Sequence, residues 1–373
     1  MCRRITAAVL AVLLILLTFG CGKGSDENAT NRVQDSAENG KIAIVIGAYE
    51  QSPEIYAAAN EISKAHPESV ILLKYAEDFH TDVTAVTSVA TAVAENHNVK
   101  AILFADGVKG TAAAVKAVRD MRDDICIVVC DPHESTLESK AADLMLSVDF
   151  PELGTSMVEK AKEMGAENFV FYSTRRHLKY SSVIALRNAA EAACKDEGLT
   201  FSATSSIDLY ESGRTLESAK KYLAEDAARK EEKFGKKTAL FCTEPLVQGA
   251  LASEAIAHGM VMPATFMPSP LALAKDLGVD LKDHETDSAY AMKQLGDQNV
   301  GADGIVATWG FSVYTAFLQT AYDYAAGVLN GSGKATSVER IQKLLADHTA
   351  GAQITVTTDA NGAYLVQSEL VTL

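Results

Sequence analysis

The densest group of chemically active side chains in this sequence is a cationic loop. The segment YSTRRHLKYSS, residues 172–182, contains Arg175, Arg176, His177 and Lys179. A guanidinium binds a carboxylate or a phosphate through two parallel hydrogen bonds, so one of these arginines could hold an anionic group of a ligand. Two adjacent arginines cannot easily face one pocket, and we expect at most one to do so. The alternative is a solvated loop whose cations pair with surface acids.

Three carboxylates stand at the ends of short apolar runs. Asp106 ends KAILFAD, Asp131 ends ICIVVCD, and Glu244 follows KTALFC by one residue. A carboxylate in such a place can accept hydrogen bonds from hydroxyl or amine groups of a ligand. Each could equally cap a helix or fix a loop. We therefore name all three as candidate ligand-binding residues beside this structural alternative.

A flat ligand would need an aromatic face. Trp309 is the single tryptophan, and Tyr49 lies in a loop that could face it. Stacking would use the large rigid faces of both rings. The alternative role for Trp309 is packing in a hinge.

No motif of a catalytic site is found. The segment VIGAYEQSPE has one glycine where a dinucleotide-binding loop needs three, and no Walker loop occurs. GFSVY lacks the second glycine of a nucleophile elbow. The histidines at positions 66, 80 and 97 lack the spacing of metal ligands on a common face. We expect no enzymatic activity, no cofactor and no metal site.

The N-terminus has the pattern of an export signal. Arg3 and Arg4 precede an uninterrupted apolar or small run over residues 7–19, which is shorter than the roughly 20 residues of a membrane span. The sequence LTFGC then resembles the bacterial lipobox, in which a small residue precedes a lipidated cysteine. Thr18 and Phe19 depart from the usual lipobox residues. The alternative is an ordinary signal peptide with a chance cysteine.

We expect a signal peptide over residues 1–20, lipidation of Cys21 and a flexible tether over 21–40. The tether prediction rests on a segment with almost no apolar side chains. Acyl chains on Cys21, palmitate among them, would hold the protein on the extracytoplasmic face of the cell membrane. The formal net charge of −15 disfavours nucleic acid as a partner.

The rest of the chain alternates apolar runs with amphipathic ones. Near-continuous apolar runs predict parallel strands covered on both faces, at 41–47, 69–75, 100–106 and 125–131. Helical patterns lie between them at about 53–66, 81–97 and 110–122. This rhythm predicts right-handed βαβ units and a doubly wound sheet. Cys126 and Cys130 fall on one face of one such strand, so we expect buried thiols and no disulfide between them.

A second series of the same kind follows. Strands are predicted at 168–173, 200–207, 237–242, 260–265 and 304–307, and QITVTTDANGAYLVQSELV predicts a hairpin with a turn at DANG. The fold class is therefore α/β, with two doubly wound parallel-sheet lobes and a cleft between them. We assign residues 41–149 and 311–350 to lobe 1, and 150–310 and 351–373 to lobe 2. Ligands of such sheets bind beyond the carboxyl ends of the strands.

A lipidated cysteine, a tether, two wound lobes and a terminal hairpin resemble type I periplasmic substrate-binding proteins. The resemblance covers about residues 41–373. Among the subfamilies it is greatest to uncharacterised lipoproteins of anaerobic bacteria with this fold, and smaller to sugar or nucleoside binders. It implies three chain crossings between the lobes, near 149–151, 308–311 and 350–353.

The resemblance also implies a function. We expect a monomeric, lipid-anchored solute-binding protein that captures a small polar or anionic ligand and delivers it to the permease of an ABC importer. One alternative is a lipoprotein that senses a ligand and passes its state to a membrane receptor, and another is a surface enzyme. Transcription factors of this fold are excluded by the exported N-terminus and the missing helix-turn-helix.

Overall fold

The computed structural model describes residues 40–47, 52–75, 83–134, 141–298 and 304–373. All of these belong to one compact unit of the chain. The predicted signal peptide, the tether up to residue 39, Cys21 and Tyr49 lie outside the described residues. Within them, no helix combines the length and the apolar composition that crossing a bilayer requires.

The first lobe is built on a seven-stranded sheet in the order β10-β11-β5-β4-β3-β1-β2. All neighbours run parallel except β10 and β11. The strands are β1 (Lys41–Ile46), β2 (Val70–Lys74), β3 (Val99–Phe104), β4 (Cys126–Cys130), β5 (Leu144–Val148), β10 (Ile354–Thr358) and β11 (Tyr364–Ser368). The helices are α1 (Pro53–Ala65), α2 (Thr84–Ala94), α3 (Thr111–Met121), α11 (Val313–Gly327) and α12 (Val338–Ala346).

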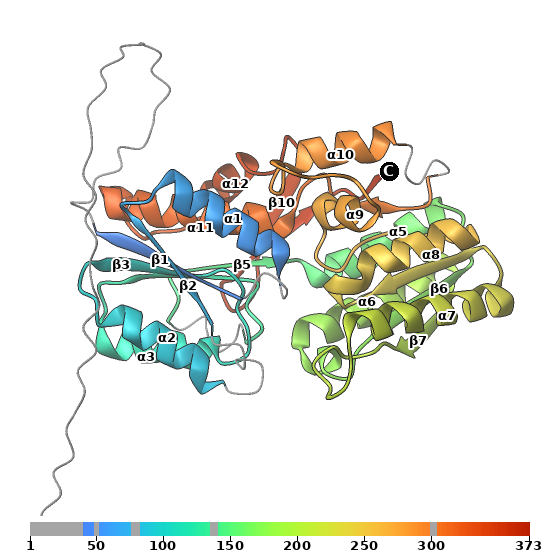
Figure 1. Cartoon of the computed structure of the whole chain (residues 1–373), viewed down its shortest axis with the longest axis horizontal. Helices are drawn as coiled ribbons and strands as arrows, with labels where there is room; N and C mark the ends of the chain where they lie inside the picture. The colour runs from blue at the N-terminus through green and yellow to red at the C-terminus, as the bar shows by residue number, and fades with distance from the viewer. Residues whose placement is uncertain (1–39, 48–51, 76–82, 135–140, 299–303) are drawn as a thin grey trace, which may run out of the picture. The chain divides into compact units, whose positions relative to one another are not determined.

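Helices cover both faces of this sheet, as its apolar strands require. Ile42, Ile44 and Ile46 of β1 pack in a cluster with residues of α1 and α11. Ala43 and Val45, which alternate with them, pack in a second cluster with residues of α2 and α3. Figure 1 shows α1, α11 and α12 on one side of the sheet and α2 and α3 on the other. Two-sided burial explains why β1 is apolar from Ile42 to Ile46.

The second lobe is built on a three-stranded parallel sheet in the order β7-β6-β8. Its strands are β6 (Asn168–Ser173), β7 (Thr200–Ser205) and β8 (Thr238–Cys242). Its helices are α5 (Phe150–Glu163), α6 (Ser181–Glu197), α7 (Leu216–Phe234) and α8 (Gln248–His258), followed by α9 (Pro270–Asp276) and α10 (Ser288–Asp297). Phe169 and Phe171 pack in the cluster that holds α5 and α6, whereas Val170 and Tyr172 pack with α7 and α8.

Isolated bridges continue the second sheet. Val261 bridges to β8, and Met262 bridges to Val306, beside β9 (Ala307–Thr308). β9 pairs with β12 (Val371–Thr372). The strand predicted over 260–265 is therefore reduced to single bridges. The expected fold class, two α/β lobes with parallel sheets, is confirmed.

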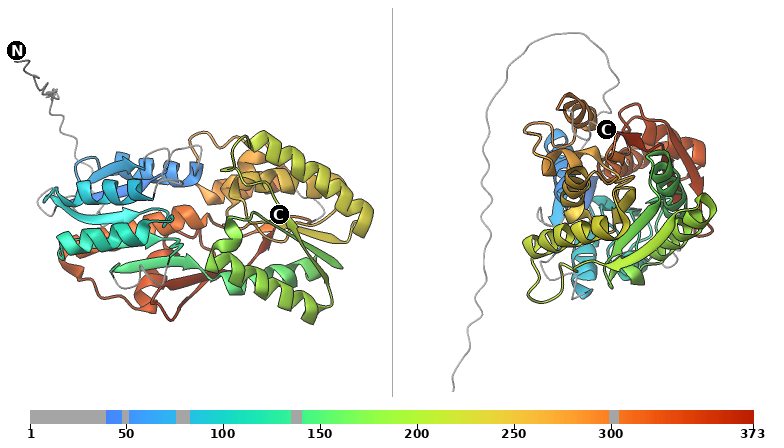
Figure 2. Two further views of the ribbon diagram at one scale, coloured as in Figure 1. Left: turned by 90° about the horizontal axis from the view of Figure 1, so that it is seen from below. Right: turned by 90° about the vertical axis from the view of Figure 1, so that its right-hand side faces the viewer.

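The assignment of residues 351–373 to the second lobe is wrong for the hairpin. β11 pairs in parallel with β5 of the first lobe, and the backbone N–H of Asp149 donates to the carbonyl of Val366 at 2.9 Å. The left view of Figure 2 shows the red C-terminal strands beside the green strand β5. β5 would otherwise leave an unpaired sheet edge, and β11 covers it. Only β12 joins the second lobe.

The two lobes are linked by a partly buried carboxylate. Glu54, in the first turn of α1, accepts hydrogen bonds from Ser269 Oγ at 2.7 Å and from Ser312 Oγ. Both serines also cap helices, because Ser269 Oγ accepts from the N–H of Leu271 and Ser312 Oγ from that of Thr315. The start of α1 is thereby tied to the starts of α9 and α11.

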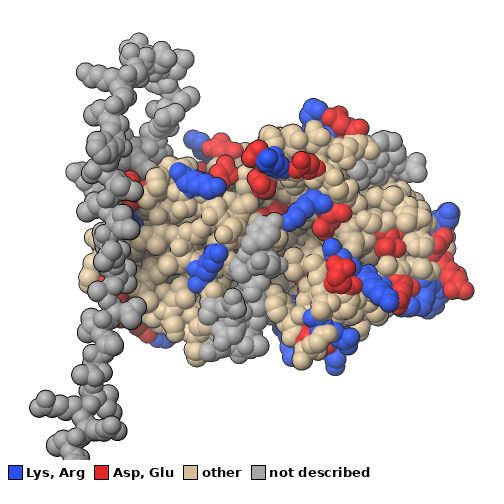
Figure 3. Space-filling model, viewed as in Figure 1, with Lys and Arg blue, Asp and Glu red and all other residues tan. Residues whose placement is uncertain are grey.

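Two further features agree with the sequence. The four cysteines in the described part of the chain are buried free thiols, and burial raises the pKa of Cys126 to about 12. Cys126 and Cys130 are thus packing residues, as expected. On the face seen in Figure 3, acidic and basic side chains intermix over the second lobe, so the net negative charge forms no single acidic patch there.

Candidate functional site

A pocket of about 550 Å³ lies at the carboxyl ends of the strands of both sheets. Its residues follow β3, β4, β6, β7 and β8, and Tyr314 at the start of α11 also lines it. Loops after parallel strands converge at one edge of each sheet, so residues far apart in sequence meet here. The volume is in the range that small-molecule sites occupy.

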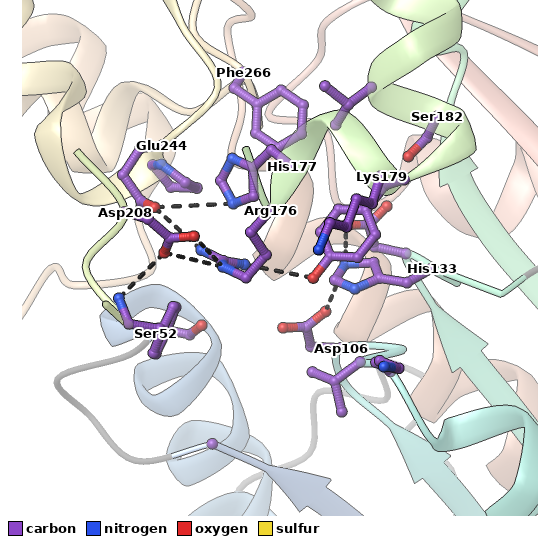
Figure 4. A pocket seen from close by; sticks show the side chains of 18 of the residues that line it. Ser52, Asp106, His133, Arg176, His177, Lys179, Ser182, Asp208, Glu244 and Phe266 are labelled. Atoms are coloured by element: carbon purple, nitrogen blue, oxygen red, sulfur yellow. Dashed lines mark hydrogen bonds and ion pairs between the residues drawn. The ribbon is translucent and has the colours of Figure 1, made fainter. Parts of the chain in front are cut away.

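Strand order places an arginine between two acids on the second-lobe face. Arg176 follows the central strand β6, Asp208 follows β7 on one side, and Glu244 follows β8 on the other. Arg176 Nε donates to both carboxylate oxygens of Asp208, at 3.1 and 3.2 Å. Its NH2 group lies 3.5 Å from Glu244 Oε2. Figure 4 shows this group on one side of the pocket.

Two tyrosines complete the surroundings of this guanidinium. Arg176 NH1 donates to Tyr180 Oη at 3.4 Å, and its central carbon lies 4.5 Å from the ring centroid of Tyr210. A guanidinium is attracted to the face of an aromatic ring. Asp208 and Glu244 therefore compensate the charge of Arg176, and the two rings pack around its guanidinium.

Glu244 is the most buried acid of the pocket, at 4% exposure. Burial raises the pKa of its carboxyl to about 7, although the nearby Arg176 acts in the opposite direction. Its Oε2 receives no hydrogen bond from any described residue, and the nearest ring nitrogen, His177 Nε2, is 3.8 Å away. Burial, followed by the charge of Arg176, lowers the pKa of His177 to about 3, so His177 is neutral at physiological pH.

Asp106 and Asp131 stand side by side on the first-lobe face because β3 and β4 are neighbours. His133 Nε2 lies 3.7 Å from Asp106 Oδ1 and 3.7 Å from Asp131 Oδ2, which is too long for hydrogen bonds. Burial raises the pKa of Asp106 to about 6, and the charge of Asp131 adds to this effect while His133 opposes it. Figure 4 shows Asp106 and His133 together on the side of the pocket away from Glu244.

Backbone contacts hold these two loops in register. Gly107 N donates to the carbonyl of Cys130 at 2.7 Å, and His133 N donates to the carbonyl of Gly107 at 2.9 Å. A side chain at position 107 would meet Pro132 Cα at 2.7 Å, so only glycine fits between the loops. Asp131 itself has a φ of 46°, a left-handed conformation that aspartate tolerates better than most residues.

Aromatic side chains form much of the remaining wall. The ring of Phe266 stacks on Phe150, with centroids 5.4 Å apart, and Tyr180 lies 4.8 Å from His133. Burial, with the nearby charges of Asp106 and Asp131, raises the pKa of Tyr314 well above its ordinary value. Tyr314 thus keeps its phenolic proton and can donate a hydrogen bond into the pocket.

The structure brings together four of the residues named from sequence. Asp106, Asp131, Arg176 and Glu244 all line the pocket. Arg175 does not: its side chain is 85% exposed and lies 3.5 Å from Glu211. The expectation that at most one of the paired arginines faces the pocket agrees with this arrangement.

The stacking role predicted for Trp309 is contradicted. Its side chain is fully buried, packs against Phe311 at 5.4 Å between centroids, and does not line the pocket. Trp309 belongs to the apolar cluster that contains α1 and α11, so no face of its ring is open to a ligand. Its predicted partner Tyr49 lies outside the described residues.

Several pocket residues were not named from the sequence, among them Asp208, His133 and Tyr314. Asp208 follows β7, and its place just after the strand predicted over 200–207 is the same signal that pointed to Asp106 and Asp131. His133 follows Asp131 by two residues, and its side chain is only 22% exposed and lies between two acids. Tyr314 had no sequence signal, since it faces the pocket only because α11 begins beside the first sheet.

One group of side chains in the described part of the chain has the geometry to hold a cation. Ligand atoms of Asp106, Asp131 and His133 lie within 4.8 Å of one another. Carboxylate and imidazole are ligands that divalent metals accept. The same pair of acids would equally accept hydrogen bonds from an ammonium group.

Comparison with known proteins gives a family match. The model of the family described as "Protein of unknown function (DUF3798)" matches residues 41–307. A protein of Treponema pallidum (strain Nichols), described as uncharacterized, is 33% identical over 148 residues, which cover 39% of this chain and 67% of that protein. A second from the same organism is 28% identical over 213 residues, covering 57% of this chain and 95% of the relative.

Solved structures share the fold at low identity. A candidate transcriptional regulator from Clostridium difficile 630 has a TM-score of 0.74 at 17% identity, over 89% of this chain and 99% of its own. An ABC transporter solute-binding protein from Clostridium phytofermentas with bound L-rhamnose has a TM-score of 0.55 at 10% identity, over 90% and 95%. LsrB from Clostridium saccharobutylicum in complex with AI-2 has a TM-score of 0.52 at 13% identity, over 89% and 97%.

Proposed function

Because the chain belongs to the family described as "Protein of unknown function (DUF3798)" and has the type I periplasmic-binding fold, we propose that it binds a small polar molecule between its two lobes. The observation that carries this proposal is the pocket itself. It draws residues from the carboxyl ends of strands in both sheets, and it holds both charged and aromatic side chains. Solved proteins of this fold that hold L-rhamnose and AI-2 support a small-molecule ligand.

The proposed function includes binding of the solute outside the cytoplasm. The export pattern at the N-terminus and the lipobox-like Cys21 support a lipid-anchored protein on the extracytoplasmic face of the membrane. A receptor there would deliver its solute to the permease of an ABC importer. A solute would shift the balance from the open to the closed form only as far as its affinity for the closed form exceeds its affinity for the open form.

The anionic ligand anticipated from the cationic loop is not favoured. Arg176, the arginine that reaches the pocket, is already paired with Asp208 and lies near Glu244. Lys109 and Lys179 also line the pocket, but both are exposed. A catalytic role is not favoured either, because the hydroxyl beside neutral His177, that of Thr243 at 3.0 Å, is fully buried, contacts Ser173 Oγ at 2.9 Å and does not line the pocket.

The test is mass spectrometry of small molecules released from freshly purified protein, followed by thermal unfolding with each released compound. We expect at least one compound that raises the Tm in proportion to the logarithm of its concentration. Solute uptake that is lost on gene deletion and restored by the wild type, but not by Cys21→Ala, would support the anchored receptor. Protein that releases no compound, and whose Tm no metabolite raises, would contradict ligand binding.

A further inference from the structure

The charges on the two faces of the pocket do not balance. Within the described lining, Arg176 pairs with both Asp208 and Glu244, and the basic nitrogen that lies within 4 Å of Asp106 and Asp131 belongs to His133. His177 adds no positive charge, because its pKa is lowered to about 3. Even with His133 protonated, these buried and half-buried side chains keep an excess of negative charge.

Lys109 and Lys179 also line the pocket, but both are exposed, so they do not neutralise these more buried acids. Two further acids of the lining are compensated by other groups. The carboxylate of Glu134 accepts a hydrogen bond from the backbone N–H of Gly110 at 2.8 Å, at the start of α3, so a helix N-terminus compensates it. Glu211 is exposed and pairs with Arg175 and Arg214 outside the pocket. The excess is therefore located at Asp106, Asp131 and Glu244.

A second, independent feature points to a ligand. Glu244 is more than nine-tenths buried, lines the pocket and has an oxygen, Oε2, that receives no hydrogen bond from any described residue. A buried acceptor without a donor is costly unless a bound group supplies one. The aromatic walls add faces that attract cations.

From this arrangement we propose that the pocket selects a small organic cation, whose protonated amine is bound by Asp106 and Asp131 while Glu244 Oε2 accepts a further hydrogen bond from the ligand. The inference rests on the proposed binding function and specifies its ligand class. A protonated amine brings both the missing positive charge and the missing donors. A neutral polyol would bring donors without charge, and an anion would add to the excess.

The volume favours an organic cation over a bare metal ion. Asp106, Asp131 and His133 could contact a metal, but they occupy only one end of a pocket of about 550 Å³. A metal alone would leave Glu244 Oε2, on the opposite lobe, without a hydrogen bond. A ligand of several heavy atoms can reach both faces.

The test separates ligands by charge before they are identified. A bacterial metabolite extract is divided by ion exchange at pH 7.5 into cationic, neutral and anionic pools, and the Tm of the purified full-length protein is measured with each. We expect the cationic pool to raise the Tm by several degrees. Acetylation of its amines should abolish the effect, and addition of EDTA should not.

Stabilisation by the neutral or the anionic pool alone would overturn the inference while leaving solute binding intact. Loss of the effect with EDTA, or its survival after acetylation, would assign the site to a metal or to another cation. Stabilisation by none of the three pools would count against the proposed binding function as well.

Variants locate the amine. The double variant Asp106→Asn, Asp131→Asn should lose the Tm response to the cationic pool, and Glu244→Gln should weaken binding of the stabilising compound at least tenfold. Each must show a cooperative unfolding transition without the pool, so that lost response is not lost folding. Glu95→Gln, an exposed acid at the end of α2, is the matched control and should respond like wild type. A full response in the double variant would contradict the assignment.

Discussion

On the second-lobe face of the pocket the cation of Arg176 stands between Asp208 and Glu244, whereas on the first-lobe face Asp106 and Asp131 stand together. The same kind of loop, with an acid shortly after the end of a parallel strand, gives opposite electrostatic results on the two faces. On the second lobe the strand between the two acids carries an arginine. On the first lobe the two acids follow neighbouring strands with no arginine between them.

This difference indicates two roles within one site. The second-lobe face is largely neutralised by its own residues, and Tyr180 and Tyr210 fix the position of Arg176, so its shape exists before a ligand arrives. The first-lobe face keeps its charges close together without full compensation, so it gains most from a positive ligand. The second lobe therefore supplies a pre-formed wall of the pocket, and the first lobe supplies the negative charge that favours a cationic ligand.

The largest effect should come from removing the central cation of the second-lobe face. Arg176→Met leaves Asp208 and Glu244 buried without their partner, and we expect a loss of about 3 kcal/mol in the free energy of unfolding. Chemical denaturation measures it. The neighbouring Arg175→Met is the control, with a change within about 0.5 kcal/mol because its side chain is 85% exposed. Equal effects of the two substitutions would refute the buried ion pairing.

The second largest effect should come from disturbing the backbone contact that holds the loops of Asp106 and Asp131 together. Gly107→Ala forces a Cβ against Pro132 Cα and Val129, so we expect a loss of about 1–3 kcal/mol and displacement of Asp106 from Asp131. Binding of a stabilising amine should weaken with it. Gly165→Ala is not a fair control, because its φ is 89°, but Gly296→Ala, which lies in α10 with open space around it, should stabilise the protein by up to about 1 kcal/mol. Calorimetric titration of both variants checks the result.

A smaller effect should appear in the pH dependence of stability. The pKa of Asp106 is raised to about 6, so its carboxyl stays protonated to a higher pH in the folded state than in the unfolded state. The contribution of this group to the free energy of unfolding is therefore complete below about pH 4 and is lost as the pH rises to about 6. His133, Asp131 and Tyr314 face this carboxyl. Asp106→Asn should flatten this part of the profile and stabilise the unliganded protein at pH 8 by about 1–2 kcal/mol.

The same reasoning applies to Glu244 over a higher range. Its pKa of about 7 predicts a loss of stability between about pH 4.5 and 7, with Arg176, Asp208 and His177 facing it. Thermal unfolding of wild type, Asp106→Asn and Glu244→Gln from pH 4 to 8 measures both contributions. Parallel profiles for all three proteins would show that neither acid is held protonated by burial.

The smallest effect on ligand binding should come from the fully buried tryptophan. Trp309→Phe keeps an apolar ring in the cluster and removes an indole N–H that has no hydrogen-bond partner among the described residues. We expect a stability change of about 1 kcal/mol and no change in affinity for the stabilising compound. A clear loss of affinity at unchanged stability would restore the stacking role that the structure contradicts.

Much of the scaffold could be predicted from local sequence. The runs that became β1, β3 and β4 are almost entirely apolar because both faces of the first sheet are covered, and that pattern can be read from the sequence. Asp106, Asp131 and Glu244 could be named because each stands within two residues of the end of such an apolar run. The hairpin could be predicted from the turn signal DANG. In the structure, Asp359 Oδ1 of this turn accepts hydrogen bonds from the N–H groups of Asn361 and Ala363.

The sequence alone did not show which lobe the hairpin joins or what Trp309 packs against. The hairpin joins the first lobe because β5 presents an open edge to β11, and no residue in the hairpin encodes that choice by itself. Trp309 looked like a stacking residue because it is large, unique and close to a crossing. Its complete burial beside Phe311 follows from how α11 packs on the first sheet.

The sequence by itself determined which side chains stand at the ends of strands, because each strand ends where an apolar run gives way to a polar loop. Only the tertiary structure decided which of those side chains are neighbours. Electrostatic energy depends on the distance between charges, and the lateral order of strands sets that distance. Arg176 is therefore balanced by two acids, and Asp106 and Asp131 are left to share one histidine.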